Sequence, residues 1–143
     1  MTISKKRFLL FIFLQLLECN KTVHAHVLLD IQPIITVDQL LSQLNQQQPT
    51  CIVLSTEHCS FCTMLKNNLP AIAAKYPSVS FFIVKQNTRQ IVNSPSVLNF
   101  LQEKQFKIPG YPSIMFVSKN YFNKQIGGDI KTLEKNLKTL LKS

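Results

Sequence analysis

Hydrophobic and polar residues follow two patterns along the chain, one typical of buried strands and the other of amphipathic helices. Continuous hydrophobic runs of strand length predict strands that are buried on both faces of a sheet. The run at 51–54 is continuous, while the strand-length segments at 79–84 and 113–117 are hydrophobic except for Ser80 and Ser113. Hydrophobic residues spaced i, i+3, i+4 and i+7 predict amphipathic helices between and after the strands.

The first half of the pattern contains two predicted helices. Residues 27–31 are expected to form a short first strand or lead-in that Pro33 closes. Thr36 can cap a helix, whose hydrophobic residues are Val37, Leu40, Leu41 and Leu44. A second helix is predicted at 63–75, with its hydrophobic stripe at Met64, Leu65, Leu69 and Ile72. Pro70 inside it is expected to kink or divide the helix.

The second half predicts another helix, a hairpin and a last helix. Ser94 and Pro95 form a helix start. Residues 121–126 are expected to form a fourth strand, antiparallel to 113–117 across a short turn. Asp129, after two glycines, can cap a final amphipathic helix. Strands alternating with helices predict an α/β layer fold, and 143 residues are enough for one domain.

The first 25 residues are expected to be a signal peptide. Residues 1–7 carry three basic side chains, 8–17 contain only Gln15 as a polar residue, and Ala25 ends a polar stretch. This is the layout of a secretory signal, and cleavage after Ala25 would leave 26–143 as the mature domain. Ten hydrophobic residues rise only about 15 Å as a helix, half of the hydrocarbon thickness of a membrane. We therefore expect a periplasmic or secreted protein without stable membrane insertion after cleavage.

Two alternatives to a cleaved signal stay open. The segment could be retained as an uncleaved anchor. Cys19 with the residues before it faintly resembles a bacterial lipoprotein box, although Glu18 stands where that signal has a small residue. Export matters for the chemistry because oxidising compartments let a disulfide persist.

The composition indicates a soluble, cationic globular domain. The net charge is +9, and residues 26–143 carry 12 basic and 6 acidic side chains. Because these lysines are scattered and not clustered with stacking aromatics, we do not expect nucleic acid as a partner. With 45% hydrophobic residues, the chain can build a core without needing disulfides. A monomer is expected.

The candidate chemistry lies in the motif Cys59-Ser-Phe-Cys62, which follows the predicted strand 51–54. In α/β folds, the loops at the carboxyl ends of central strands carry the functional groups. Cys59 would lie at a helix N-terminus, where free N–H groups and the helix dipole favour the thiolate. Cys59 is therefore the expected nucleophile, and Cys62, one turn further, would resolve the mixed disulfide.

Other uses of the cysteines stay open. The same thiols could hold copper or zinc, with His58 or His26, although a structural zinc site wants four ligands and no histidine follows Cys62. A purely structural disulfide would close a loop too short to constrain the unfolded chain much. Cys51, in a hydrophobic run, is expected to fill the core, with a regulatory or intermolecular thiol as the minority interpretation.

Residues 27–143 resemble the thioredoxin superfamily, on the cysteine motif together with the segment Phe-Lys-Ile-Pro-Gly-Tyr-Pro-Ser at 106–113. The resemblance implies a thioredoxin-like fold, with a central mixed β-sheet flanked by helices on both faces. It implies a cis peptide bond before Pro112, facing the cysteine pair, and a substrate strand docked on Pro112 and the backbone of Tyr111. Gly127 takes the place of the glycine that precedes the last helix in this superfamily. The implied activity is thiol–disulfide exchange with protein substrates and a redox partner protein, without a cofactor.

The chain departs from thioredoxins proper near the motif. His58 replaces the tryptophan before the nucleophile, Ser60-Phe61 replaces Gly-Pro, and Val53 stands where thioredoxins have a buried carboxylate. His58 and Phe61 are therefore expected to modulate the pair, and a protonated His58 would stabilise the thiolate. The direction of electron flow stays open.

Overall fold

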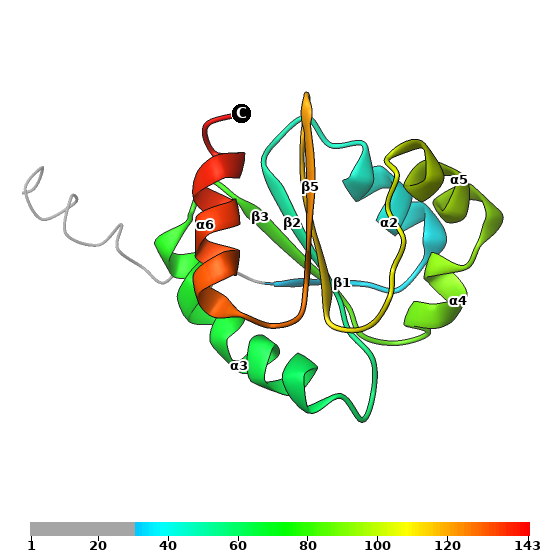
Figure 1. Cartoon of the computed structure of the whole chain (residues 1–143), viewed down its shortest axis with the longest axis horizontal. Helices are drawn as coiled ribbons and strands as arrows, with labels where there is room; N and C mark the ends of the chain where they lie inside the picture. Colours follow the sequence, from blue (N-terminus) through cyan, green and yellow to red (C-terminus); the bar gives the residue numbers. More distant parts are fainter. Residues whose placement is uncertain (1–30) are drawn as a thin grey trace, which may run out of the picture.

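The computed structural model of the chain describes residues 31–143 (Figure 1). The expected signal peptide, Cys19, His26 and most of the expected strand at 27–31 lie outside the described residues.

The described residues form one mixed sheet with these strands: β1 (Gln32–Ile34), β2 (Thr50–Leu54), β3 (Ser80–Val84), β4 (Ser113–Ser118) and β5 (Tyr121–Ile126). Their order across the sheet is β1-β3-β2-β4-β5. The strands β1, β3 and β2 are parallel, while β4 is antiparallel to β2 and β5 is antiparallel to β4. The expected buried strands and the hairpin are thus confirmed, and β2 lies at the centre of the sheet.

Helices cover both faces of this sheet: α2 (Val37–Leu44), α3 (Ser60–Lys75), α4 (Thr88–Val92), α5 (Pro95–Glu103) and α6 (Ile130–Leu140). Figure 1 shows α3 and α6 on one side of the strands and α2, α4 and α5 on the other. Each side encloses its own core. Phe116 and Leu137 belong to the core under α3 and α6, and Ile52 and Leu101 belong to the core under α2, α4 and α5.

The cap expected at the start of α2 is present. Thr36 accepts a hydrogen bond from the N–H of Gln39 at 3.2 Å, and the Gln39 side chain accepts from the N–H of Thr36 at 3.2 Å. This reciprocal pair is a capping box, which satisfies N–H groups that have no partner within the helix. At α6, the carboxylate of Asp129 accepts from the N–H of Thr132 at 2.8 Å, as expected.

Three details differ from the sequence-based expectations. Pro33 does not close a strand but lies inside β1, where an edge position tolerates a residue without an N–H. Pro70 does not divide its helix, since α3 is continuous from Ser60 to Lys75. The short helix α4 was not predicted, because five residues are too few to show a helical period.

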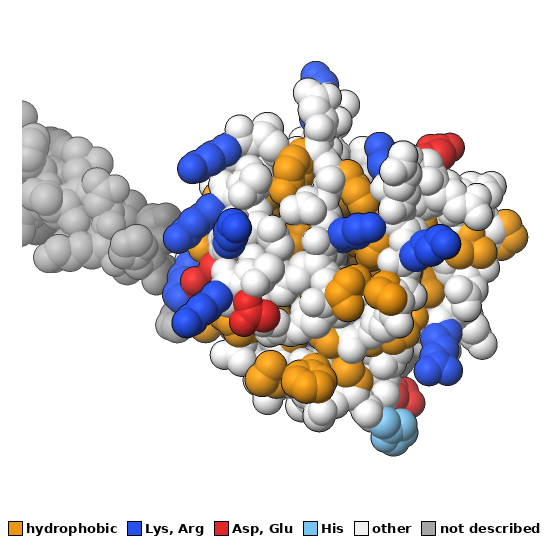
Figure 2. Space-filling model, in the orientation of Figure 1, with side chains coloured by type: hydrophobic (Ala, Val, Ile, Leu, Met, Phe, Trp, Pro, Cys, Tyr) orange, Lys and Arg blue, Asp and Glu red, His pale blue; other side chains and the backbone are white. Residues whose placement is uncertain are grey.

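The surface is mainly polar, with basic side chains outnumbering acidic ones. Figure 2 shows several of these basic side chains together over α6, and hydrophobic side chains exposed over α3. None of the helices formed by residues 31–143 is long and hydrophobic enough to cross a membrane.

Candidate redox site

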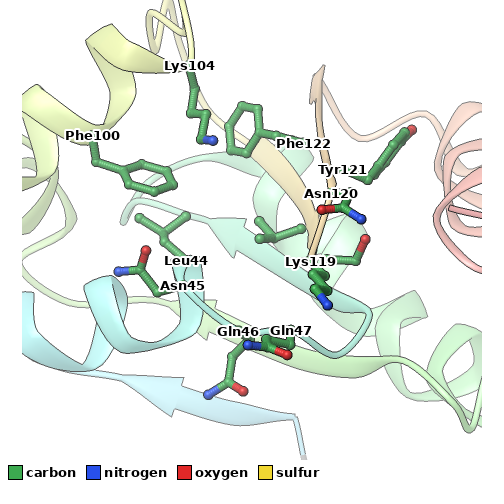
Figure 3. A pocket seen from close by; sticks show the side chains of 12 residues that line it. Leu44, Asn45, Gln46, Gln47, Phe100, Lys104, Lys119, Asn120, Tyr121 and Phe122 are labelled. Atoms are coloured by element: carbon green, nitrogen blue, oxygen red, sulfur yellow. The ribbon is translucent and has the colours of Figure 1, made fainter.

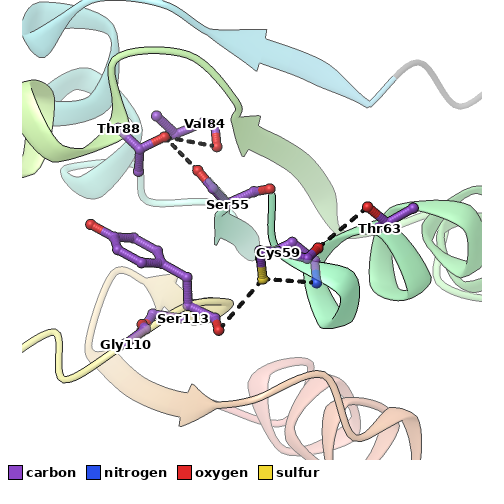
Figure 4. Close-up of a disulfide and its surroundings, with 9 residues drawn as sticks. Ser55, Cys59, Thr63, Val84, Thr88, Gly110 and Ser113 are labelled. Carbon is purple, nitrogen blue, oxygen red and sulfur yellow. Dashed lines mark hydrogen bonds between the residues drawn. A yellow bond between two sulfur atoms is a disulfide. The ribbon is translucent and has the colours of Figure 1, made fainter. Parts of the chain in front are cut away.

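The Cys59–Cys62 pair lies at the junction between the central strand β2 and the helix α3. β2 ends at Leu54, a short loop follows, and Cys59 is the N-cap residue of α3. Its Sγ accepts a hydrogen bond from the backbone N–H of Cys62 at 3.2 Å (Figure 4). The position expected for the leading sulfur, at a helix N-terminus, is therefore present.

The two cysteines form a disulfide in this structure, with their Cα atoms 5.2 Å apart. They differ in access to solvent. Cys62 is fully buried, whereas Cys59 is partly exposed. An incoming sulfur therefore reaches Cys59 and not Cys62.

A second loop, just before β4, faces the disulfide. The Tyr111–Pro112 peptide bond is cis, as expected, and the carbonyl oxygen of Tyr111 lies 3.7 Å from the Sγ of Cys59 (Figure 4). In the disulfide this sulfur carries no proton, so the contact becomes a hydrogen bond only when Cys59 is a protonated thiol. The pairing of Leu54 with Ser113 in adjacent strands brings this loop beside the cysteines.

A mainly hydrophobic groove of about 660 Å³ runs beside the disulfide, between the start of α3 and the loop after β5. Phe61, Met64 and Ile126 line it and are 64%, 46% and 47% exposed. Tyr111 and Pro112 form another part of its wall. The structure thus brings the predicted residues Phe61, Tyr111 and Pro112 together around the cysteine pair.

Met64 and Ile126 were not predicted as site residues. The helical period placed Met64 in the buried stripe of α3, but its side chain is exposed in the groove. The reason is local. Gly128, which has no side chain, lies against the backbone of Phe61 and the side chain of Met64, so this part of α3 faces a loop and not the core.

His58 precedes the nucleophile directly and is exposed. Its backbone has a φ of 56°, in the left-handed region that histidine enters more readily than most residues other than glycine. Val53 is buried in β2, so a hydrophobic side chain and not a carboxylate takes this core position.

Cys51 lies apart from the redox pair. It is fully buried in β2, and burial raises the pKa of its thiol far above the ordinary value. It therefore packs as a small hydrophobic side chain, as expected, and stays protonated. Among residues 31–143, no group of three or more His, Cys, Asp or Glu side chains is placed to hold a metal ion.

Another hollow, of about 340 Å³, lies at the opposite end of β2 and β4 from the disulfide (Figure 3). The rings of Phe100 and Phe122 meet edge to face there at 6.1 Å, and the Nζ of Lys104 lies 5.7 Å from the centre of the Phe100 ring. None of the residues predicted for redox chemistry lines this hollow.

Comparison with known proteins identifies the fold. No protein-family model and no curated protein sequence matches the chain. Among solved structures, thioredoxin from Trypanosoma brucei brucei superposes with a TM-score of 0.63 at 16% identity, over 84% of this chain and 97% of that one. Oxidised mitochondrial thioredoxin 3 from Saccharomyces cerevisiae gives 0.58 at 19% identity, over 76% and 94%. Oxidised thioredoxin O1 from Arabidopsis thaliana gives 0.58 at 13% identity, over 76% and 95%.

The chain therefore has a thioredoxin fold. Within it, a C-x-x-C disulfide lies at the N-terminus of α3 and faces a cis-proline loop.

Proposed function

We propose that this protein is an exported thiol–disulfide oxidoreductase that exchanges disulfides with protein substrates through Cys59 and Cys62. The observation that carries this proposal is the position of the Cys59 sulfur. It is partly exposed, it caps α3, and it accepts the N–H of Cys62 at 3.2 Å. Hydrogen bonding and the positive end of the helix dipole both stabilise a thiolate at this sulfur.

In the reducing direction, the Cys59 thiolate attacks one sulfur of a substrate disulfide. A mixed disulfide between Cys59 and the substrate forms, and the other substrate sulfur leaves as a thiolate. The Cys62 thiolate then attacks the Cys59 sulfur, which releases the second substrate thiolate and forms the Cys59–Cys62 disulfide. Two electrons pass from the cysteine pair to the substrate, so no cofactor takes part.

The oxidising direction reverses these steps. A substrate thiolate attacks the Cys59 sulfur of the disulfide, because Cys62 is buried. The Cys62 thiolate leaves, and a second substrate thiolate then attacks the substrate sulfur of the mixed disulfide. The substrate becomes oxidised, and both cysteines return to the reduced form.

The groove beside the disulfide is suited to hold an extended substrate segment. Its exposed hydrophobic side chains, Phe61, Met64 and Ile126, would gain by burial against a partner. Tyr111 and Pro112 lie between this groove and the sulfur that reacts. We assign these residues to substrate binding, and we assign His58 and Phe61 to modulating the pair.

Export is part of the proposal and rests on the sequence pattern of residues 1–25. In an oxidising compartment the pair would stay a disulfide. Either a redox partner protein would reduce this disulfide, or the disulfide would oxidise substrate proteins. Mass spectrometry of the protein recovered from the periplasm or the medium tests this. A new N-terminus at His26 supports cleavage, and an intact N-terminus in the membrane fraction contradicts it.

The activity is tested by the reduction of insulin, or of a peptide disulfide, with dithiothreitol as electron donor and a chelator present. Wild type and Cys51→Ser should turn over, while Cys59→Ser should not. Turnover that survives in Cys59→Ser would refute the proposal. Equilibration with glutathione buffers then gives the direction, since potentials near about −270 mV are typical of reductants and near about −120 mV of oxidants.

A further inference from the structure

A polar hollow lies beside the redox pair and is distinct from the hydrophobic groove. It has a volume of about 420 Å³ and is formed by the loop before Cys59, including Glu57 and His58, together with residues from Lys85 to Gln90. It shares no lining residue with the groove formed by Phe61 and Met64.

Buried contacts connect the two loops that form this hollow. Thr88 is 3% exposed, and its hydroxyl donates a hydrogen bond to the carbonyl oxygen of Ser55 (Figure 4). The N–H of Ser55 in turn donates to the carbonyl oxygen of Val84 at 3.0 Å. These contacts anchor residues 85–89 to the segment that leads into Cys59. The two loops that line the hollow are therefore held together by the fold.

The charges around the hollow are unbalanced. Lys85 and Arg89 line it, and Glu57 is the acidic residue on its wall. One salt bridge forms within residues 31–143, between Lys75 on α3 and Glu134 on α6. Lys85 and Arg89 therefore have no carboxylate from these residues within ion-pairing distance. A carboxylate that enters the hollow would therefore meet two cationic side chains that have no ion-pair partner among residues 31–143.

The hollow also adjoins the reacting cysteine. His58 lines the hollow together with Arg89, and it directly precedes Cys59 in the chain. A substrate segment whose cysteine reacts with Cys59 would thus pass the hollow that Arg89 lines.

We propose that Lys85 and Arg89 bind a carboxylate side chain of the substrate polypeptide, next to the cysteine that forms the mixed disulfide. This rests on the proposed function and adds a substrate class to it, namely disulfides flanked by Asp or Glu. Two separate surfaces then lie near Cys59, the hydrophobic groove and the polar hollow.

The test compares three peptide disulfides that differ only in the residues on both sides of the cysteine, which are Glu, Gln or Lys. Rates of reduction by the pre-reduced full-length protein are measured at low salt. Each rate is divided by the rate of the same peptide with dithiothreitol, which removes the intrinsic reactivity of the peptide. For wild type we expect the Glu peptide to react about tenfold faster than the Gln peptide, and the Lys peptide to react slowest.

The variant Lys85→Gln/Arg89→Gln should react equally fast with the Glu and Gln peptides. Its control is Lys135→Gln/Lys138→Gln, which removes the same charge from the exposed side of α6 and should keep the preference. The preference should also weaken as salt is added, because ions screen partly exposed charges. Circular dichroism checks that both variants are folded.

Each failure points to a different conclusion. If wild type reduces the Gln peptide in a Cys59-dependent way but shows no preference for Glu, the carboxylate site is refuted and the proposed activity stands. If both double variants lose the preference alike, the overall charge steers the substrate and the hollow does not bind it. If no peptide reacts with wild type, both proposals fail.

Discussion

The sulfur of Cys59 accepts the N–H of Cys62 within the first turn of α3, so the residue to which we assign resolution of the mixed disulfide would also stabilise the attacking sulfur. The two roles use different atoms of Cys62. The backbone N–H is unaffected by a change of side chain, whereas resolution needs the thiol. Substitution can therefore separate attack from resolution.

In Cys62→Ser, we expect Cys59 still to attack a substrate disulfide but the mixed disulfide to accumulate, because no second thiol is positioned to release it. Turnover should fall at least about 100-fold, while a stable adduct of protein and peptide appears on a non-reducing gel. Cys59→Ser is the matched control and should form no adduct. An adduct in Cys59→Ser would mean that the Cys62 thiol attacks the peptide disulfide, contrary to its full burial.

Cys51 should be unreactive in the folded protein. Its side chain is fully buried, and burial raises the pKa of the thiol, so both access and thiolate formation are suppressed. After reduction and treatment with iodoacetamide, site-resolved mass spectrometry should find Cys59 modified within minutes and Cys51 modified only after denaturation. Modification of Cys51 at a rate similar to that of Cys59 would contradict its assignment to the core.

Much of this site could be predicted from the sequence because it depends on local patterns. A hydrophobic run followed by Cys-x-x-Cys and a helical period places Cys59 at a strand–helix junction, and the structure has it there. For the capping box at Thr36, the sequence analysis predicted the N-cap residue but not its partner Gln39, which follows three residues later.

The rest depends on tertiary packing, which periodicity does not describe. The hydrophobic stripe on α3 predicts which side of the helix is buried, but it does not predict at which turn the core ends. The prediction that Met64 is buried was therefore wrong. Lys85 and Arg89 lie near His58 only because β2 and β3 are parallel neighbours whose carboxyl ends meet. Neither loop contains a residue pattern that predicts this contact between them.

Thr36→Ala should destabilise the protein by about 1 kcal/mol, because it removes the acceptor for the N–H of Gln39 from the capping box. Thr36→Ser keeps the hydroxyl and should lie within about 0.5 kcal/mol of wild type. Urea denaturation of both variants measures this. Equal destabilisation by Ala and Ser would show that the methyl group of Thr36 matters and the cap does not.

The cap of α6 should make stability depend on pH in the acid range. Hydrogen bonds from the side chain and the N–H of Thr132 hold the pKa of Asp129 below its ordinary value of 3.8. The folded state therefore binds the proton less readily than the unfolded state, and the contribution of the carboxylate is complete above the ordinary pKa. It is lost as the pH falls through the lowered pKa of the folded state.

Two variants isolate this effect. The difference in melting temperature between wild type and Asp129→Ala should be largest at neutral pH and should shrink below about pH 4. Asn also caps helices but does not titrate, so Asp129→Asn should keep a constant advantage over Asp129→Ala. A difference between wild type and Asp129→Ala that does not change with pH would contradict the role of the carboxylate.

Gln125 should hold the loop that forms one wall of the hydrophobic groove. Its side-chain amide is buried and donates to the carbonyl oxygens of Gly127 and Asp129 at 3.3 and 2.9 Å, while its Oε1 accepts from Asn136 at 3.2 Å. Gln125→Met has a similar size but leaves these groups without partners. We expect it to cost about 1–3 kcal/mol in urea denaturation.

Because Gly127 and Asp129 line the groove, Gln125→Met should also raise the KM for peptide disulfides more than it lowers kcat. Gln125→Glu retains an acceptor for Asn136 but loses both donors to the loop, so it separates the contact with α6 from the contact with the loop. If the loop contacts set the groove, both variants should raise the KM. If only Gln125→Met raises it, the contact with Asn136 on α6 positions the wall instead.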